Sequence, residues 1–183
     1  MRIIAGEKRG LALMTTSRQQ FRPTLGRVKE SLFGILTPVM AGAKVLDLFA
    51  GSGALGLEAL SRGAEAALFV DNDRTAVKMI NENIRRSNYG DRCRVHNGDF
   101  RDIGEKIACG EQFDLIFADP PYHESYPEQV LAHVVTAALL PSEAILTLEM
   151  DKKEVPRALP GELKLLREKF YGATLIWILQ RKL

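Results

Sequence analysis

Four consecutive residues, Asp119, Pro120, Pro121 and Tyr122, carry the sharpest chemical signal in this sequence. They directly follow an apolar run, residues 113–118, that predicts a buried strand. Each proline ring fixes φ and removes a backbone N–H, so the Pro120 carbonyl can face a cleft without a competing donor. The Asp119 carboxylate is a second acceptor at the same place, and Tyr122 adds a flat face on which a planar ring can stack.

Two neighbouring acceptors suit an exocyclic amine of a nucleobase. The lone pair of such an amine is delocalised into the ring, which makes the nitrogen a poor nucleophile. Acceptors that hold both amine hydrogens polarise the nitrogen and aim its lone pair at an electrophile, so catalysis rests on positioning and electrostatics. Residues 119–122 therefore predict a catalytic segment for substitution at an amine nitrogen.

A glycine-rich loop supplies the second signal. Gly51, Gly53 and Gly56 form a G-x-G-x-x-G pattern after a predicted strand and at the start of a predicted helix, the context that gives the pattern meaning. The loop has no Lys or Arg, which excludes a P-loop. Asp47 would repel a pyrophosphate but suits a cationic ligand that carries an ammonium group. The motif alone does not separate a dinucleotide from other adenosine cofactors, but these two features favour an adenosine cofactor with an ammonium group, bound by Asp47, Phe49, Ala50, Gly51, Ser52 and Gly53.

Two further acids follow the next predicted strands. Asp71 lies 20 residues after Gly51, where a carboxylate accepts hydrogen bonds from ribose hydroxyls, and Asn72 adjoins it. Asp99 is placed to accept from an adenine amino group, and Phe100 to pack on the adenine ring. Local turn or helix-capping chemistry is the alternative for both acids.

Strand-like and helix-like segments alternate from residue 44 onward. The predicted strands are 44–49, 66–70, 93–96, 113–118 and 144–148, and the predicted helices are 54–61, 73–87, 103–108 and 127–140. This alternation predicts an α/β fold with a mostly parallel sheet and helices on both faces. The segments 163–171 and 174–180 are joined by two residues and predict a C-terminal antiparallel hairpin. Residues 24–36 predict a helix, and residues 1–20 a small β-ribbon with Gly6 and Gly10 near its turn.

Length and charge set the remaining expectations. A chain of 183 residues suits one domain, with residues 1–40 as a basic extension and 41–183 as the catalytic core. Residues 1–44 carry eight basic and two acidic side chains, whereas the remainder carries 17 basic and 21 acidic ones. This asymmetry favours a polyanionic partner for the front of the chain, although a merely basic surface is an equal alternative on charge alone. The leading candidates for RNA contact are Arg9, Arg18, Arg22 and Arg27.

Several classes are disfavoured by the composition. No apolar run has the ~18 residues that a bilayer span needs, and the first residues lack the apolar region of a secretory signal. The two cysteines, Cys93 and Cys109, fit no metal or redox spacing. We therefore expect a cytoplasmic protein, monomeric, with no metal and no membrane partner.

The motifs together resemble a known family. Residues 45–53 and 119–122 resemble class I S-adenosylmethionine-dependent N-methyltransferases, and residues 1–6, 22–24 and 27–33 are similar to the bacterial 16S rRNA guanine-N2 methyltransferase (RsmD) family. The resemblance implies a Rossmann-like, seven-stranded sheet and a cytoplasmic enzyme. It implies 16S rRNA or the small ribosomal subunit as partner, with the N2 amine of one guanine as target. The family's functional positions fall on Gly51, Gly53, Asp71, Asp99 and residues 119–122 here.

Three alternatives remain open at this point. An adenine-N6 methyltransferase acting on DNA or RNA shares the four-residue motif. A non-catalytic RNA-binding or ribosome assembly factor could retain a degenerate core, although the intact acids and glycines argue against degeneracy. An NAD-dependent oxidoreductase is more distant, and binding of S-adenosylmethionine against NAD would separate it.

Overall fold

The computed structural model describes residues 1–183 apart from 16–23, 107–108 and 123–124. Its centre is a seven-stranded sheet with the order β3-β2-β1-β4-β5-β7-β6. The strands are β1 (Lys44–Leu48), β2 (Ala66–Asp71), β3 (Cys93–Asn97), β4 (Leu115–Ala118), β5 (Ile145–Asp151), β6 (Leu163–Tyr171) and β7 (Thr174–Arg181). The first five strands are parallel, and β7 runs antiparallel to both β5 and β6. The predicted α/β fold with a C-terminal hairpin is confirmed.

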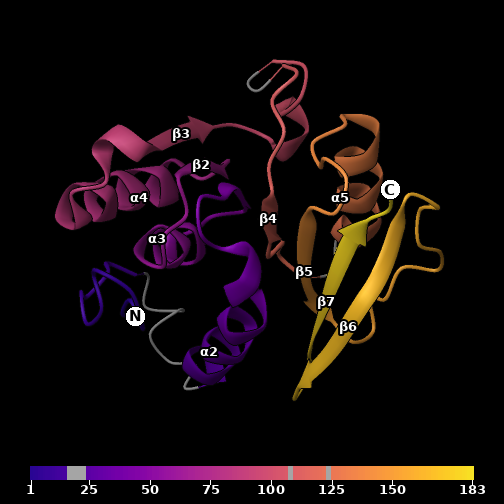
Figure 1. Cartoon of the computed structure of the whole chain (residues 1–183), viewed down its shortest axis with the longest axis horizontal. Helices are drawn as coiled ribbons and strands as arrows, with labels where there is room; N and C mark the ends of the chain where they lie inside the picture. Colours follow the sequence, from indigo (N-terminus) through magenta and orange to yellow (C-terminus); the bar gives the residue numbers. More distant parts are fainter. Residues whose placement is uncertain (16–23, 107–108, 123–124) are drawn as a thin grey trace.

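Helices cover both faces of the sheet (Figure 1). The described elements are α2 (Thr24–Leu36), α3 (Ala54–Ser61), α4 (Arg74–Ser87) and α5 (Tyr126–Thr136), with 3-10 turns η1 (Thr37–Val39), η2 (Gly90–Arg92) and η3 (Phe100–Asp102). Among them, no helix combines the length and apolar composition that a membrane span requires.

Strand alternation divides the apolar side chains into two cores. Val45 and Phe117 belong to a cluster that also contains Phe33 of α2, whereas Leu46 and Ile116 belong to a cluster on the opposite face. Successive side chains of a strand point to opposite faces, so parallel strands covered on both sides are apolar throughout. This packing fixes the carboxyl ends of β1, β2 and β4 at one edge of the sheet. The strand order reverses between β1 and β4, which is where open α/β sheets bind ligands.

Two predicted helices differ from the structure. Residues 103–106 form turns and not the predicted helix, because Gly104 adopts φ +98°, a left-handed conformation that ends a helix. The helix predicted over 127–140 ends at Thr136, where Ala138 adopts φ +51° and redirects the chain. Leu139 and Leu140 then enter the core as buried residues of the connection to β5.

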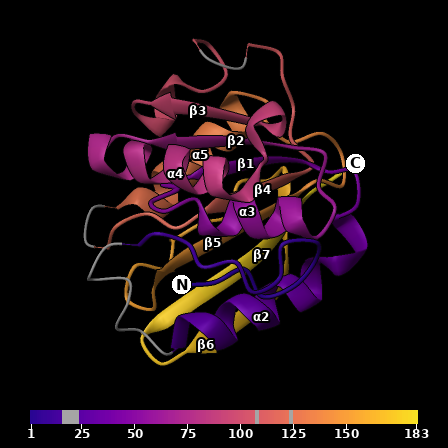
Figure 2. The same ribbon diagram turned by 90° about the vertical axis from the view of Figure 1, so that its left-hand side faces the viewer.

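The structure describes residues 1–15 of the β-ribbon that the sequence predicts over residues 1–20. Its described part forms one antiparallel bridge, between Arg2 and Ala12, and its turn contains Gly6 and Gly10 with φ +83° and +89°. In Figure 2 this segment runs between α3 and α2. The carboxylate of Glu58 in α3 accepts hydrogen bonds from the Ile4 and Ala5 N–H groups, at 2.8 and 3.0 Å, so α3 anchors the segment.

Candidate active site

The glycine-rich loop connects β1 to α3 and depends on its glycines for two reasons. Gly51 and Gly53 have φ +58° and +73°, conformations that side chains rarely adopt. Gly56 has ordinary φ, but a Cβ on it would lie 2.4 Å from the Phe69 ring and 3.2 Å from Asp47 Oδ2. The third glycine of the motif therefore lets α3 approach the sheet and Asp47 closely.

Asp47 is a buried acid behind this loop, 2% exposed. Its Oδ2 accepts a hydrogen bond from the Gly56 N–H at 2.9 Å. Burial is the main cause that raises the pKa of this carboxyl to about 8. The charges of Asp119 and Asp71 act in the same direction, whereas the Gly56 hydrogen bond and the charge of Lys29 oppose it. A carboxyl with this pKa gains most from a cationic ligand group, because such a group stabilises its charged form.

Asp71, the last residue of β2, is hydrogen-bonded to the backbone of the glycine-rich loop. Its Oδ2 accepts from the Gly51 N–H at 2.8 Å, and its Oδ1 accepts from the Asp73 N–H at 2.9 Å. Asp73 caps α4 by accepting from Thr75, whereas Asn72 is exposed between the two acids. The turn chemistry considered for Asp71 is therefore present, and a carboxylate has lone pairs left for ribose hydroxyls.

Asp99 and Phe100 lie beside a small recess after β3. Asp99 caps η3, accepting from the Arg101 N–H at 2.9 Å, and pairs with the Arg101 guanidinium at 2.6 Å. These hydrogen bonds hold the pKa of Asp99 below its ordinary value. Phe100 is 4% exposed, and its ring centroid lies 5.1 Å from that of Phe49. The capping alternative for Asp99 is thus observed, while its adenine contact stays a prediction.

The same recess includes a residue that sequence reasoning missed. Tyr126, the first residue of α5, lines this recess together with Phe49, Asp71 and Asp99. Tyr126 lies 5.3 Å from Phe49 and 6.1 Å from Phe100 between ring centroids. The aromatic group surrounds the recess from three separate elements.

The segment from Asp119 to Tyr122 follows β4 directly, as predicted. Asp119 is exposed and Pro120 is buried, and together with Pro121 and Tyr122 they line a hollow of about 350 Å³. The Tyr122 hydroxyl lies 3.0 Å from Thr174 Oγ1 in β7. The C-terminal hairpin therefore holds the ring of Tyr122 at the edge of this hollow.

A second cavity, of about 290 Å³, lies next to the hollow and shares Phe49 and Asp119 with it. Its walls also contain Lys29 from α2, within the family-like segment 27–33, and Glu149 from β5; neither was predicted as a site residue. Lys29 precedes the buried Phe33 by four residues, a helical spacing that is the available sequence signal for its burial. The remaining wall residues are Met1, Val28, Leu32, Asp47, Ala50, Ser52, Ala54, Leu55, Ala118, Thr147 and Ile176.

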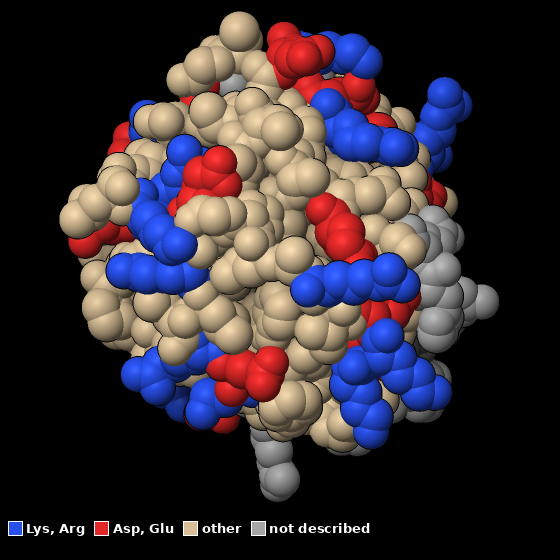
Figure 3. Space-filling model, turned by 90° about the vertical axis from the view of Figure 1, so that its right-hand side faces the viewer, with Lys and Arg blue, Asp and Glu red and all other residues tan. Residues whose placement is uncertain are grey.

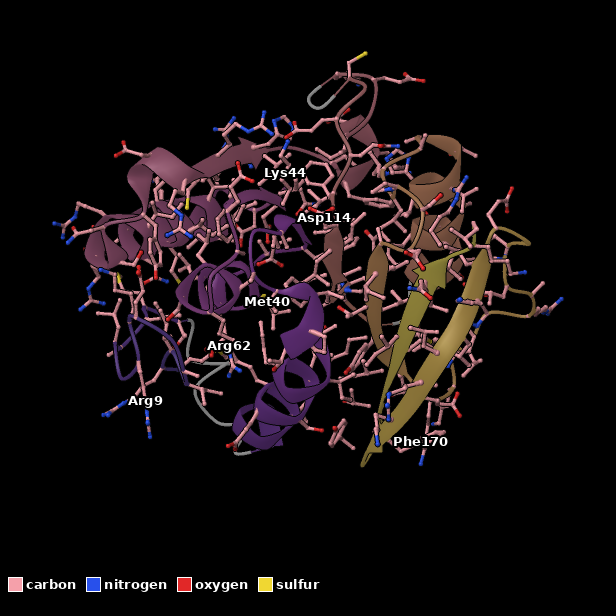
Figure 4. All side chains as sticks on the ribbon, viewed as in Figure 1. Arg9, Met40, Lys44, Arg62, Asp114 and Phe170 are labelled. Carbon is pink, nitrogen blue, oxygen red and sulfur yellow. The ribbon has the colours of Figure 1, made fainter. Side chains whose placement is uncertain are left out.

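The proposed RNA-binding arginines are not brought together by the described part of the chain. Arg9 points outward from the turn of the N-terminal segment (Figure 4), and this turn packs on Ser61 at the C-terminal end of α3, away from the glycine-rich loop. Arg18 and Arg22 lie outside the described residues. Arg27 lies in α2, and its side chain is outside the described part.

Known proteins match this chain over its whole length. The sequence model of the family described as conserved hypothetical protein 95 matches residues 1–180. The ribosomal RNA small subunit methyltransferase D of Escherichia coli K12 is 34% identical over 182 residues, which cover 100% of this chain and 90% of that protein. The protein of the same name from Haemophilus influenzae is 35% identical over 173 residues, or 94% and 89% of the two chains. The solved structure of the yhhF protein from Escherichia coli superimposes with a TM-score of 0.89 at 34% identity, covering 100% of this chain and 98% of that one. The chain therefore belongs to the conserved hypothetical protein 95 family, to which the ribosomal RNA small subunit methyltransferase D proteins belong.

Proposed function

We propose that this protein methylates the exocyclic N2 amine of a guanine in small-subunit ribosomal RNA, with S-adenosylmethionine as methyl donor. The observation that carries the proposal is the position of Asp119. It lines both the cavity next to the glycine-rich loop and the hollow next to Tyr122, so one acid borders a cofactor space and a base-sized surface.

The residues around the loop fit this cofactor. Gly51 and Gly53 give the loop its positive φ, Gly56 lets α3 approach Asp47, and Asp47 is a buried acid in the cavity wall. Asp71 is proposed to accept from ribose hydroxyls, and Phe49, Asp99 and Phe100, which line one recess, are proposed to contact adenine. When bound, S-adenosylmethionine supplies an electrophilic methyl group.

The chain's own residues then act on the amine. The Asp119 carboxylate and the Pro120 carbonyl accept hydrogen bonds from the two N2 hydrogens, which localises the nitrogen lone pair. The ring of Tyr122 stacks on the guanine and fixes its plane. As the amine nitrogen takes up the methyl group that the cofactor would supply, Asp119 would accept the proton that this nitrogen loses and release it to solvent.

The basic N-terminal segment, residues 1–44, is proposed to contact the RNA. Phosphate neutralisation dominates nucleic-acid affinity, and eight of the first 44 residues are basic. Figure 3 shows the side of the molecule that lies on the right in Figure 1, where basic and acidic side chains are interspersed. Arg9, Arg18, Arg22 and Arg27 are the proposed phosphate contacts, within a single cytoplasmic domain that consists of the extension 1–40 and the core 41–183.

The decisive experiment is methyl transfer from radiolabelled S-adenosylmethionine to ribosomal RNA and to small subunits from a strain that lacks the gene. Nucleoside analysis should detect N2-methylguanosine, and the Asp119→Ala protein is the matched control. N6-methyladenosine would show that the adenine alternative is right. Wild-type protein that binds cofactor and RNA but transfers no methyl to either substrate would favour the non-catalytic alternative.

A further inference from the structure

One buried cation borders the cofactor cavity and has no part in the function proposed above. Lys29 lies in α2 with 5% of its surface exposed, and it lines the cavity of about 290 Å³ together with Asp47 and Ser52. Its ammonium lies 2.9 Å from Glu58 Oε2. Among the residues that the structure describes, however, no atom accepts a well-directed hydrogen bond from this ammonium.

The charge of Glu58 is already balanced by the guanidinium of Arg62. Its Oε1 accepts from Arg62 Nε at 2.8 Å and from the Ala5 N–H at 3.0 Å, and its Oε2 accepts from the Ile4 N–H at 2.8 Å. Lys29 and Arg62 are therefore two cations around the one carboxylate of Glu58. The nearby Asp47 has a pKa raised to about 8, so these side chains carry one excess positive charge while Asp47 is protonated. In Figure 4 Arg62 lies between α3 and α2, so Lys29 supplies the positive charge on the cavity side.

An excess buried charge is costly unless a counter-charge occupies the space it borders. Burial lowers the pKa of Lys29 below its ordinary value, and Glu58 opposes this effect. The first turn of α3, at Ala54 and Leu55, lines the same cavity and adds the positive end of a helix dipole. Both features favour a small anion next to the cavity wall formed by α2.

We propose that Lys29 binds the carboxylate at the amino-acid end of S-adenosylmethionine, with Asp47 on the side of the ammonium group. The inference rests on the proposed cofactor. An amino-acid zwitterion needs an acid and a base within one cavity, and Asp47 and Lys29 both line this one. An RNA phosphate is a poorer fit, because a lysine that is 5% exposed in a cavity wall is out of reach of a polynucleotide backbone.

The test separates the carboxylate from the rest of the ligand. Calorimetry would compare S-adenosylhomocysteine with its decarboxylated analogue, 5′-(3-aminopropylthio)-5′-deoxyadenosine, which keeps the ammonium. The wild-type protein should bind the carboxylated ligand at least ~10-fold more tightly, the value of a charge-assisted hydrogen bond. In Lys29→Gln this preference should fall to less than ~3-fold, while affinity for the analogue changes little.

Arg62→Gln is the matched control, because it removes the other cationic partner of Glu58 without touching the cavity wall. It should lower the melting temperature and keep the preference for the carboxylated ligand. Equal affinities of the wild-type protein for the two ligands would overturn the assignment even if no Lys29 variant folds. A Lys29→Gln protein that retains the full preference would also overturn it. A wild-type protein that binds neither ligand would instead contradict the proposed function.

Discussion

The carboxylate of Asp71 accepts a hydrogen bond from the backbone N–H of Gly51, with Oδ2 2.8 Å from the nitrogen. This contact joins the end of β2 to the loop that follows β1. The acid therefore stabilises the conformation of the loop in addition to its proposed contact with ribose. Loss of this side chain should affect the cofactor site in two ways at once.

Asp71→Ala should weaken binding of S-adenosylmethionine by about 1–3 kcal/mol, the value of a charge-assisted pair of hydrogen bonds. Asp71→Asn keeps one acceptor oxygen for the Gly51 N–H and should lose less. Calorimetry on both variants measures the difference. Wild-type affinity in Asp71→Ala would contradict the ribose assignment.

Asp47→Asn should stabilise the cofactor-free protein at neutral and alkaline pH. The folded-state pKa of Asp47 is about 8, whereas its ordinary value is 3.8. Between these values the unfolded chain is ionised and the folded chain holds the proton, so this group lowers stability as pH rises from about 4 to 8. The amide has no charge and should remove that slope.

Thermal unfolding at pH 5 and pH 8 tests this expectation. The Asn variant should melt several degrees above wild type at pH 8, at ~2–4 °C per kcal/mol for a chain of this size, with a smaller difference at pH 5. Cofactor affinity should fall in the same variant. A lower melting temperature at pH 8 would show that Asp47 is not an unfavourable buried acid.

Asp119→Ala should lower the single-turnover rate of methyl transfer by at least ~100-fold, comparable to the loss of one preorganised electrostatic group. Affinity for S-adenosylhomocysteine should stay within a few-fold of wild type, because Asp119 is an exposed residue at the mouth of the cavity. Rapid quench with radiolabelled cofactor gives the rate. An unchanged rate would remove Asp119 from the mechanism.

Two substitutions at Tyr122 separate the contribution of its ring from that of its hydroxyl. Tyr122→Phe loses the hydroxyl contacts with Thr174 and Glu149 but keeps the stacking face, so kcat/KM for RNA should fall by at most ~10-fold. Tyr122→Ala should cost about 1–3 kcal/mol in kcat/KM, the value of base stacking on an aromatic ring. Steady-state kinetics on an RNA fragment distinguish them. Equal losses in both variants would indicate that the hydroxyl, not the ring, matters.

The N-terminal turn allows a paired stability test. A Cβ on Gly6 would lie 1.7 Å from Ser61 O, whereas Gly10, also at positive φ, has no atom within 4 Å among the described residues. Gly10→Ala should cost only the left-handed strain of about 1–2 kcal/mol. Gly6→Ala should cost clearly more, because the turn must leave α3. Urea unfolding measures both, and similar losses would show that the contact with Ser61 is unimportant.

The sequence by itself determined the features that depend on neighbours along the chain. Gly51 and Gly53 could be recognised because a loop with positive φ requires glycine at those positions. The same holds for Asp71 and Asp119, because an acid directly after an apolar run marks the carboxyl end of a strand. The mostly parallel sheet and the antiparallel direction of the hairpin also followed from alternation and from the two-residue connection.

Only the tertiary structure decided which side chains that are far apart in the sequence line the same cavity. Lys29, Glu149 and Thr174 lie in α2, β5 and β7, and no spacing in the sequence links them to the glycine-rich loop or to residues 119–122. Their approach to Asp47 and Tyr122 depends on how helices and strands pack. The pKa of Asp47 is likewise a tertiary property, because burial and not residue type raises it. The helix predicted over 103–108 was wrong in its described part, and the one predicted over 127–140 ends earlier, for a related reason. Apolar residues that are periodic enough for a helix, such as Ile103, Leu139 and Leu140, pack in the core from non-helical segments.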